Sequence, residues 1–593
     1  MAKRNEATAK RSWWGRVWAI FPSRQELAEN RLAFVWALIS GLVLRLAYQP
    51  LHWSFVTLVM LVPLFWGLRR CPPKVAFWAG LVFGTVYGYW GVGWATIVAR
   101  FNPLVYLGIL PASIWWGLHM AVALAAIVYT LRRVGPWVGL FSAMMIWWGM
   151  EYFRSVGKLG LPIGFLGHGL GGWDSLAQVA SIAGVPLLSA IIVGVNLAIM
   201  ECIAVVRAGY GHAGAFARLG LMAGIVVLGH VYGARVISAT NAAYEGEDSF
   251  PVRVAMVQTG IDQMDKFQSY ADPDGDVRAK LQLQIFTSLM QQLGTIERSS
   301  VDLVVTPESS LTNDLVDVDE AIQRRLYGAA IMMDLIQWSR ETRVPLVVGG
   351  VDNVFANKDG ELTESVLEGI DADGQFLPGR KIYGALWLLR PEDDQIAPTA
   401  TYRKSYLMPF GEEVPYLDII PGFAENIVQV GTFAKAPLAP PTGMWVQRDA
   451  LEPQRELRLG FSICFEDLIP KLHRHYASYG TQLYVNTTND AWFDGSQGPG
   501  FHFDMARWRC IENRVPMARC TNSGITAIVS ATGEVLESLP VREQGILTTE
   551  VRVLKEPGRT LYSRIGDLPG LLAFLGSLGL LLVLRRRREP SGN

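Results

Sequence analysis

At 593 residues, half of them hydrophobic, and with a positive mean hydropathy, the chain is too long and too apolar to be one ordinary soluble domain. Its 53 basic and 53 acidic residues balance, which argues against binding to nucleic acid or another polyanion. The five cysteines lack the close, even spacing of a disulfide framework. The composition therefore predicts a membrane protein that carries a soluble part.

Residues 1–31 are basic and have no small-residue cleavage site behind a short apolar core, so we interpret them as a cytoplasmic tail. About eight apolar runs suit a bilayer core of about 30 Å: about seven within residues 32–237 and one within the final segment, 569–593. The runs lie near Leu32–Tyr48, Phe55–Leu68, Val75–Val98, Val105–Leu131, Pro136–Met150, Val179–Val205, Leu219–Val236 and Leu571–Leu584.

Basic residues gather in alternate loops between these runs. One set of loops holds Arg69, Arg70, Lys74, Arg132, Arg133, Arg207, Arg218 and the Arg585 to Arg588 run, whereas the opposite set holds only Arg100, Arg154 and Lys158. Since Lys and Arg accumulate on the cytoplasmic side, both termini are predicted to be cytoplasmic and residues 238–568 to lie outside the cytoplasm. We expect Glu151 and Arg154 to pair at the membrane interface.

Residues 238–568 alternate short β-rich runs with amphipathic stretches, which predicts an α/β domain. The predicted strands are Val252–Met256, Leu303–Val305, Pro345–Val348, Ala385–Leu389, Leu457–Ile463, Leu483–Asn486 and Ile525–Val529. The predicted helices are Asp276–Leu293, Val316–Arg340 and Phe501–Asn513, and the Pro-rich run Ala436–Thr442 is interpreted as a surface loop.

Three segments place a reactive side chain just after an apolar strand: LVVTPES with Glu308, TYRKSYLMPFGEEVPY with Lys404, and LGFSICFED with Cys464. A thiol that attacks a carbonyl, a carboxylate that moves its proton and an ammonium that stabilises the oxyanion are what covalent acyl transfer needs. Taken singly, such a cysteine is more often a buried small hydrophobe and such a lysine a solvated surface residue.

The order Glu, Lys, Cys resembles the nitrilase superfamily. The stretches PFGEEVP, CFED and NTTNDAWFDGSQGPGFHFDMARWRCIENRVPMARCTNSGITAIVSATGEV are similar to one branch of it, the bacterial apolipoprotein N-acyltransferases, and the likeness covers nearly the whole chain. It implies a multi-pass α-helical membrane bundle plus an extracytoplasmic α/β nitrilase-like domain, an α-β-β-α sandwich. That domain would be residues 238–568.

The same resemblance assigns site residues. Glu308 would be the general base, Lys404 the oxyanion-stabilising lysine and Cys464 the nucleophile. Glu412, Glu466 and Phe465 would support the active site. Phe465 stands where the family usually has Tyr, and Phe267 where it usually has Trp, so a phenolic and an indole hydrogen bond are lost while aromatic bulk is kept.

The function that the resemblance implies is transfer of a fatty acyl group from a membrane phospholipid to the α-amino group of a diacylglyceryl apolipoprotein, in the bacterial inner membrane with the catalytic domain on the periplasmic side. The enzyme would be a monomer without a cofactor. One alternative is a membrane-anchored amidase or nitrilase in which water resolves the thioester. Another is an inactive scaffold or transporter-like protein, which the intact reactive positions and the scarcity of intramembrane charge disfavour.

Further cysteines and histidines give weaker signals. Cys510 and Cys520 are interpreted as buried packing residues, with a disulfide between them left open outside the cytoplasm. His473 and His475 alternate as metal ligands sometimes do, but no acidic or thiol partner has suitable spacing. We therefore interpret them as part of a solvated loop and predict no metal site.

Overall fold

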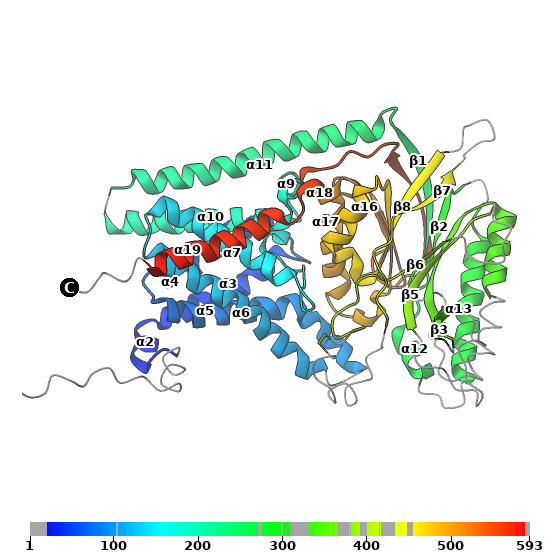
Figure 1. Ribbon diagram of the computed structural model, residues 1–593, viewed down its shortest axis with the longest axis horizontal. Helices are drawn as coiled ribbons and strands as arrows, with labels where there is room; N and C mark the ends of the chain where they lie inside the picture. Colours follow the sequence, from blue (N-terminus) through cyan, green and yellow to red (C-terminus); the bar gives the residue numbers. More distant parts are fainter. Residues whose placement is uncertain are drawn as a thin grey trace, which may run out of the picture.

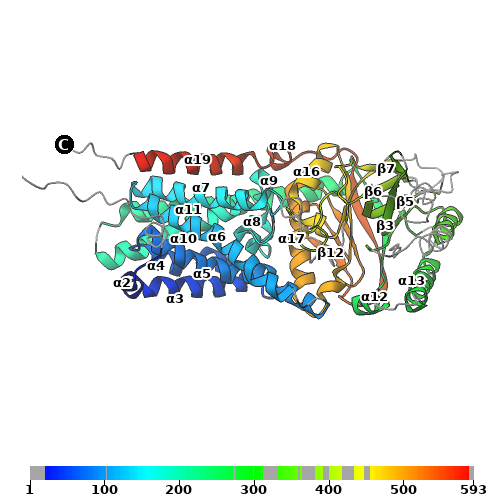
Figure 2. The same ribbon diagram turned by 60° about the horizontal axis from the view of Figure 1, so that its bottom comes forward.

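The computed structural model describes residues 21–586, apart from 102, 104, 210, 271–275, 298–299, 309, 311–330, 358, 360, 364–378, 380, 392–399, 414, 417–432 and 447–454. A bundle of roughly parallel helices stands end to end with a domain built on two β-sheets (Figures 1 and 2). The two parts correspond to the apolar and the α/β regions that the sequence predicts.

Most of the predicted apolar runs are helices of the bundle. Five described stretches are long and apolar enough to cross a membrane. They are Pro73–Arg100, formed by α5 (Pro73–Val92) and η3 (Gly93–Arg100), then α6 (Val105–Leu131), α10 (Val185–Ala208), α11 (Ala213–Glu245) and α19 (Leu568–Arg586). The remaining runs are shorter or less apolar: α3 (Arg31–Val43) with η1 (Leu44–Ala47), η2 (Ser54–Leu58) with α4 (Val62–Leu68), and α7 (Pro136–Ser155).

The prediction of one continuous helix over Val179–Val205 is wrong. The short helix α9 (Ala180–Ala183) ends at Gly184, whose φ of +78° lies in the left-handed region. Helix α10 then begins at Val185 with Pro186 in its first turn. A glycine and a proline therefore divide a run that hydropathy alone reads as uninterrupted.

The predicted ion pair between Glu151 and Arg154 is also wrong, since no ion pair joins the two within the described part of the chain. Both side chains are buried and bind the backbone of the segment that follows α7. Glu151 Oε1 accepts from the N–H of Leu166 at 2.9 Å, and Arg154 Nη2 donates to the C=O of Ile163 at 3.0 Å. The two charges thus fix an irregular segment that would otherwise bury unpaired peptide groups.

The domain contains two sheets, ordered β13-β1-β2-β3-β5-β6, with β4 beside β3, and β12-β11-β10-β9-β8-β7. Strands of the first are β1 (Ser249–Gln258), β2 (Leu303–Val305), β3 (Leu346–Ala356), β4 (Leu362–Thr363), β5 (Lys381–Leu389), β6 (Ala400–Arg403) and β13 (Gly545–Leu554). Strands of the second are β7 (Thr442–Val446), β8 (Arg455–Ile463), β9 (Leu483–Thr488), β10 (Met517–Thr521), β11 (Ala527–Val529) and β12 (Val535–Ser538).

Helices cover the outer faces of both sheets (Figure 1). Helix α13 (Asp276–Gly294) packs on the first sheet, because its Leu289 and Leu293 share a buried cluster with Val257 of β1. Helices α16 (Pro470–Ser478) and α17 (Gly498–Asn513) lie against the second sheet on the side of the bundle (Figure 2). The order helix, sheet, sheet, helix confirms the predicted α-β-β-α sandwich joined to a helical bundle.

Several predicted elements differ in extent. Helix α13 and helix α17 lie where the sequence places them, and β7 begins at the end of the Pro-rich run. Of the second predicted helix, Val316–Arg340, residues 316–330 lie outside the described residues, while 331–340 are helical. Strand β13, which pairs with β1 along ten residues, was not among the predicted strands because its side chains alternate Thr, Glu and Arg with apolar residues.

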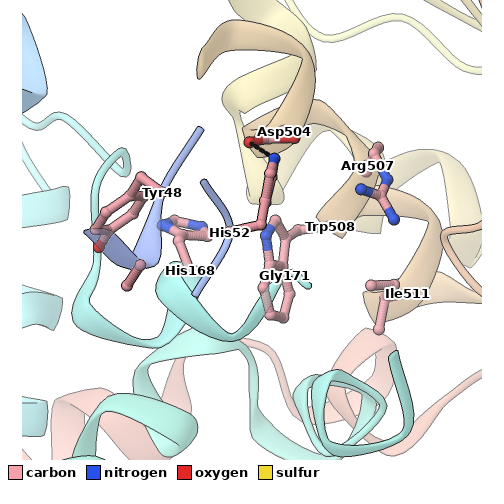
Figure 3. Close-up of a pocket in the computed structure, with 9 residues that line it drawn as sticks. Tyr48, His52, His168, Gly171, Asp504, Arg507, Trp508 and Ile511 are labelled. Atoms are coloured by element: carbon pink, nitrogen blue, oxygen red, sulfur yellow. Dashed lines mark ion pairs between the residues drawn. The ribbon is translucent and has the colours of Figure 1, made fainter. Parts of the chain in front are cut away.

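Helix α17 is one of the elements through which the α/β domain meets the bundle, beside η8 (Asp490–Phe493) and the loop at Thr532. Its Asp504 contacts His52 at 3.5 Å and accepts a hydrogen bond from Gln49 at 3.0 Å. Trp508 packs edge to face on His168, with ring centroids 5.5 Å apart. His52, His168, Asp504 and Trp508 line a small pocket between the two parts (Figure 3). The helix is therefore held from the bundle side by polar contacts and by aromatic packing together.

Candidate active site

Cys464 occupies a strained turn at the carboxyl end of β8. It is the first residue of the 3₁₀ helix η7 (Cys464–Leu468) and has a φ of +50°. A non-glycine residue in this region costs about 1–3 kcal/mol, which surrounding structure must offset. Of the five cysteines only Cys464 is partly exposed, since the other four are buried. The turn thus presents a single accessible thiol at the end of a buried strand.

Glu308 lies beside this thiol, just after β2. Its carboxylate and the Cys464 thiol influence each other's pKa, and Oε2 accepts the backbone N–H of Asn489 at 2.9 Å. Close packing on β3 makes the approach possible, because Gly349 has no side chain: a Cβ there would lie 2.3 Å from the C=O oxygen of Pro307 and 3.0 Å from Cα of Glu308. The carboxylate is therefore positioned by backbone contacts on both sides.

Lys404 follows β6 and is almost fully buried, with its side chain 1% exposed. Its Nζ lies 2.6 Å from Oε1 of Glu412 and 3.9 Å from Oε1 of Glu308. Glu412 is fixed in turn, since its Oε2 accepts the N–H of Met408 at 2.9 Å. The structure thus brings together the three reactive side chains that the sequence singles out, with Glu412 as the second partner of the ammonium.

Parallel strand direction explains how distant segments meet. Strands β1, β2 and β3 run parallel, as do β8, β9 and β10. Glu308 follows β2, Cys464 follows β8 and Asn489 follows β9, so all three extend from carboxyl ends of strands. Ligand and catalytic groups commonly gather at this edge of α/β sheets.

Burial and neighbouring charges set the protonation states. Burial raises the pKa of Glu308, and Glu412 adds to the effect although Lys404 opposes it. Burial and the Glu308 carboxylate hold the pKa of the Cys464 thiol well above its usual value despite the nearby ammonium. For Lys404, burial alone would lower the pKa, but Glu412 and Glu308 outweigh it and raise it. At neutral pH the site therefore combines a thiol, a carboxylate of raised basicity and a permanent cation.

Glu466 links the end of β6, which precedes Lys404, to the end of β8, which precedes Cys464. Its carboxylate accepts the N–H groups of Ser405 at 2.6 Å and Ile463 at 2.9 Å, and the hydroxyl of Tyr402 at 2.8 Å. Burial raises its pKa to about 7, against the opposing effect of Lys404 and these donors. These contacts place Glu466 to hold the ends of β6 and β8 together.

The remaining predicted residues have separate places. Phe465 is buried within η7. Phe267 of α12 (Gln263–Tyr270) is 42% exposed and packs on Phe101 from the bundle, with ring centroids 5.5 Å apart. The solvated-loop interpretation of His473 and His475 is wrong, because both lie in helix α16; His473 is buried against Tyr484, and His475 is partly buried.

The described part of the chain contains neither a cluster of metal-ligating side chains nor a disulfide. No group of three or more His, Cys, Asp or Glu residues there could hold a metal ion. All five cysteines are free, so Cys510 and Cys520 are not paired. The Sγ of Cys520 instead donates to the C=O groups of Val257 and Val305, each at 3.3 Å.

Sequence analysis did not identify Asn489, which helps to position Glu308. Asn489 holds Glu308 through its backbone N–H and uses its side chain to bind Gln263 at 3.0 Å and Asn522 at 3.0 Å. Its signal was available, because Asn489 follows the apolar strand near Leu483 in the same way that Cys464 follows its own strand. A backbone role, however, leaves no side-chain chemistry to recognise.

Family comparisons agree with this geometry. The model of the carbon-nitrogen hydrolase family matches residues 253–554, which include every catalytic candidate. The chain belongs to the carbon-nitrogen hydrolase family. Residues 40–198 match the apolipoprotein N-acyltransferase N-terminal domain, so this family member carries that domain ahead of the sandwich.

Two relatives of this carbon-nitrogen hydrolase family member align with it over nearly the full length of both chains. A protein of Geobacter metallireducens named apolipoprotein N-acyltransferase is 28% identical, over 94% of this chain and 96% of its own length. One of the same name from Azotobacter vinelandii is 28% identical over 93% and 95%, respectively. Among solved structures, an amidase from Nesterenkonia sp. is 17% identical, with a TM-score of 0.33, over 54% of this chain and 94% of its own.

Substituting Gly349→Ala should move Glu308 away from the thiol, because the new Cβ would overlap the Pro307 carbonyl. We expect a loss of activity on the order of 10²-fold, the effect of misplacing a reacting group by about 1 Å. Turnover and the melting temperature of the purified variant should be measured together. Gly443→Ala in β7 is the matched control, since its Cβ would meet only the side-chain end of Glu456. Equal activity of the two variants would contradict the assignment.

Proposed function

We propose that the chain is an apolipoprotein N-acyltransferase that works through a thioester on Cys464. The observation that carries the proposal is the site itself: a partly exposed thiol and a carboxylate of raised pKa beside a buried ammonium, in a domain joined to an apolipoprotein N-acyltransferase N-terminal domain. The acceptor is a lipoprotein and the donor a lipid. More specifically, the donor is a phospholipid, and the acceptor is the α-amino group of a diacylglyceryl-cysteine.

In the first half-reaction, Sγ of Cys464 attacks the ester carbonyl of the donor while Glu308 takes the thiol proton. General-base removal fits a thiol whose pKa is raised, since little thiolate exists at rest. The Lys404 ammonium lies 3.9 Å from the base and stabilises the developing oxyanion. Collapse of the tetrahedral intermediate breaks the ester bond, Glu308 returns the proton to the leaving alkoxide, and the acyl chain remains as a thioester.

In the second half-reaction, the amine of the acceptor attacks the thioester carbonyl. Glu308 takes a proton from the attacking nitrogen, and the C–S bond breaks as the amide forms. The departing sulfur recovers a proton from Glu308, which restores the starting thiol. Lys404 cannot serve as the base, because two carboxylates keep its pKa raised.

Both substrates carry acyl chains, which accounts for the fusion of the catalytic domain to a membrane bundle. Each methylene withdrawn from an apolar environment costs about 0.8 kcal/mol, so a thiol held at the bilayer surface avoids extracting the chain. We propose residues 1–31 as a cytoplasmic tail, 32–237 and 569–593 as membrane parts, and 238–568 as the catalytic domain on the periplasmic side of a bacterial inner membrane. One chain supplies the whole triad, which supports action as a monomer.

Substitution of the triad separates the roles. Cys464→Ala should abolish formation of the acyl-enzyme, Glu308→Gln should block proton removal from the thiol, and Lys404→Met should leave the oxyanion unsupported. Intact-mass spectrometry after incubation with phospholipid checks all three, with the wild-type protein gaining one acyl chain. An acyl adduct on the Cys464→Ala protein would contradict the assignment of the nucleophile. Wild-type adduct formation by either other variant would remove that residue from the first step.

The side of the membrane can be tested with reporter fusions. An enzyme that is active only in the cytoplasm should be silent when fused near Pro440 and active when fused after Arg586, because basic loops are retained on the cytoplasmic side. Activities would be normalised to the amount of fusion protein in the membrane. A strong cytoplasmic signal near Pro440 would overturn the periplasmic placement.

A further inference from the structure

A closed ring of four buried charges lies behind the active site. His502 of α17 contacts Asp467 Oδ1 through Nε2 at 2.7 Å and Asp490 Oδ1 through Nδ1 at 2.8 Å. Arg519 of β10 contacts the other oxygens, Asp467 Oδ2 through Nε and Asp490 Oδ2 through Nη2, each at 3.1 Å. The side chains of Asp467, Asp490 and Arg519 are fully buried, and that of His502 is 7% exposed. Each carboxylate therefore bonds to both cations.

The ring balances only when His502 is a cation. Two carboxylates face one guanidinium, so the imidazolium brings the net charge of the ring to zero. Both imidazole nitrogens lie within hydrogen-bond distance of a carboxylate oxygen, so the doubly protonated imidazole can donate to both aspartates, while Nδ1 also lies 3.2 Å from Nη2 of Arg519. Burial opposes this state, but Asp467 and Asp490 outweigh it and raise the pKa of His502 to about 9. An unbalanced charge at such depth would be costly.

The two carboxylates belong to the two turns that carry the reacting groups. Asp467 lies in η7, the turn that Cys464 begins. Asp490 is the first residue of η8 (Asp490–Phe493), and Asn489, the residue that caps η8, donates its N–H to Glu308. The ring therefore joins the turn of the nucleophile to the turn that fixes the base, although none of its members touches the thiol.

We propose that His502 is a positioning residue: together with Arg519 it locks η7 to η8 and so fixes the Cys464 thiol against the Glu308 carboxylate. This inference rests on the roles proposed above for those two residues. Helix α17 also bonds to the bundle through Asp504, two residues along. The ring thus connects a helix that contacts the bundle to both catalytic turns, and the same helix also reaches η7 through Arg509, which donates to the C=O of Leu468 at 3.2 Å.

The test uses the full-length protein and the variant His502→Gln, which keeps one donor but loses the charge. We expect the rate of acyl-enzyme formation from phospholipid to fall on the order of 10²-fold at an unchanged half-saturating lipid concentration, because geometry and not binding is altered. Iodoacetamide alkylation of Cys464, the one partly exposed cysteine, should slow as well. The double variant D467N/H502Q restores charge balance and should acylate about tenfold faster than H502Q.

Two further proteins complete the design. His473→Gln makes the same substitution at a buried histidine of α16 outside the ring and should keep wild-type rates. Arg519→Lys retains the charge but loses the guanidinium fork, so it supplies a milder variant if H502Q does not fold, with acylation slowed about tenfold. Wild-type acylation in folded H502Q or R519K, or a double variant no faster than H502Q, would overturn the proposal. If the wild-type protein forms no acyl-enzyme, the proposed function is overturned instead. The rate of Cys464 alkylation would then still test whether the ring positions the thiol.

Discussion

The buried ammonium of Lys404 is the interaction on which the chemistry depends. It lies between the carboxylates of Glu412 and Glu308 and faces a thiol that burial keeps protonated. Without this cation two carboxylates, whose side chains are only 18% and 20% exposed, would share one site, and at least one would take up a proton. With it, Glu308 can remain ionised although its pKa is raised, so in the proposed mechanism one fixed charge would support both proton removal and oxyanion formation.

Precision at that site is built from elements far apart in the chain. Glu466 fastens the β6 end to the β8 end, and Asn489 fastens Glu308 to the end of β9. Helix α17 connects this assembly to the membrane bundle, with His502 turned into the domain and Asp504 bonded toward the bundle. The orientation of the catalytic domain on the bilayer and the geometry of its thiol therefore share one helix.

The sequence revealed the site wherever a chemical side chain followed an apolar strand, which is why Glu308, Lys404 and Cys464 could be predicted to meet. It could not reveal the ring, because its members come from η7, η8, α17 and β10 and have no periodic spacing. The helix break at Gly184 was hidden for another reason: hydropathy measures apolarity but not backbone conformation. Likewise, alternating charge hid β13 from a search for apolar strands.

In the proposed reaction an amine, and not water, resolves the acyl-enzyme. Isolated wild-type acyl-enzyme should persist in buffer, release its chain to hydroxylamine, and transfer it to a diacylglyceryl peptide with a free N-terminal cysteine. The same peptide with an acetylated N-terminus should leave the adduct intact, because it has no nucleophilic amine. The decisive measurement is the mass of the peptide product in a single turnover. Steady release of free fatty acid at a rate that neither peptide changes would contradict the account and identify a hydrolase.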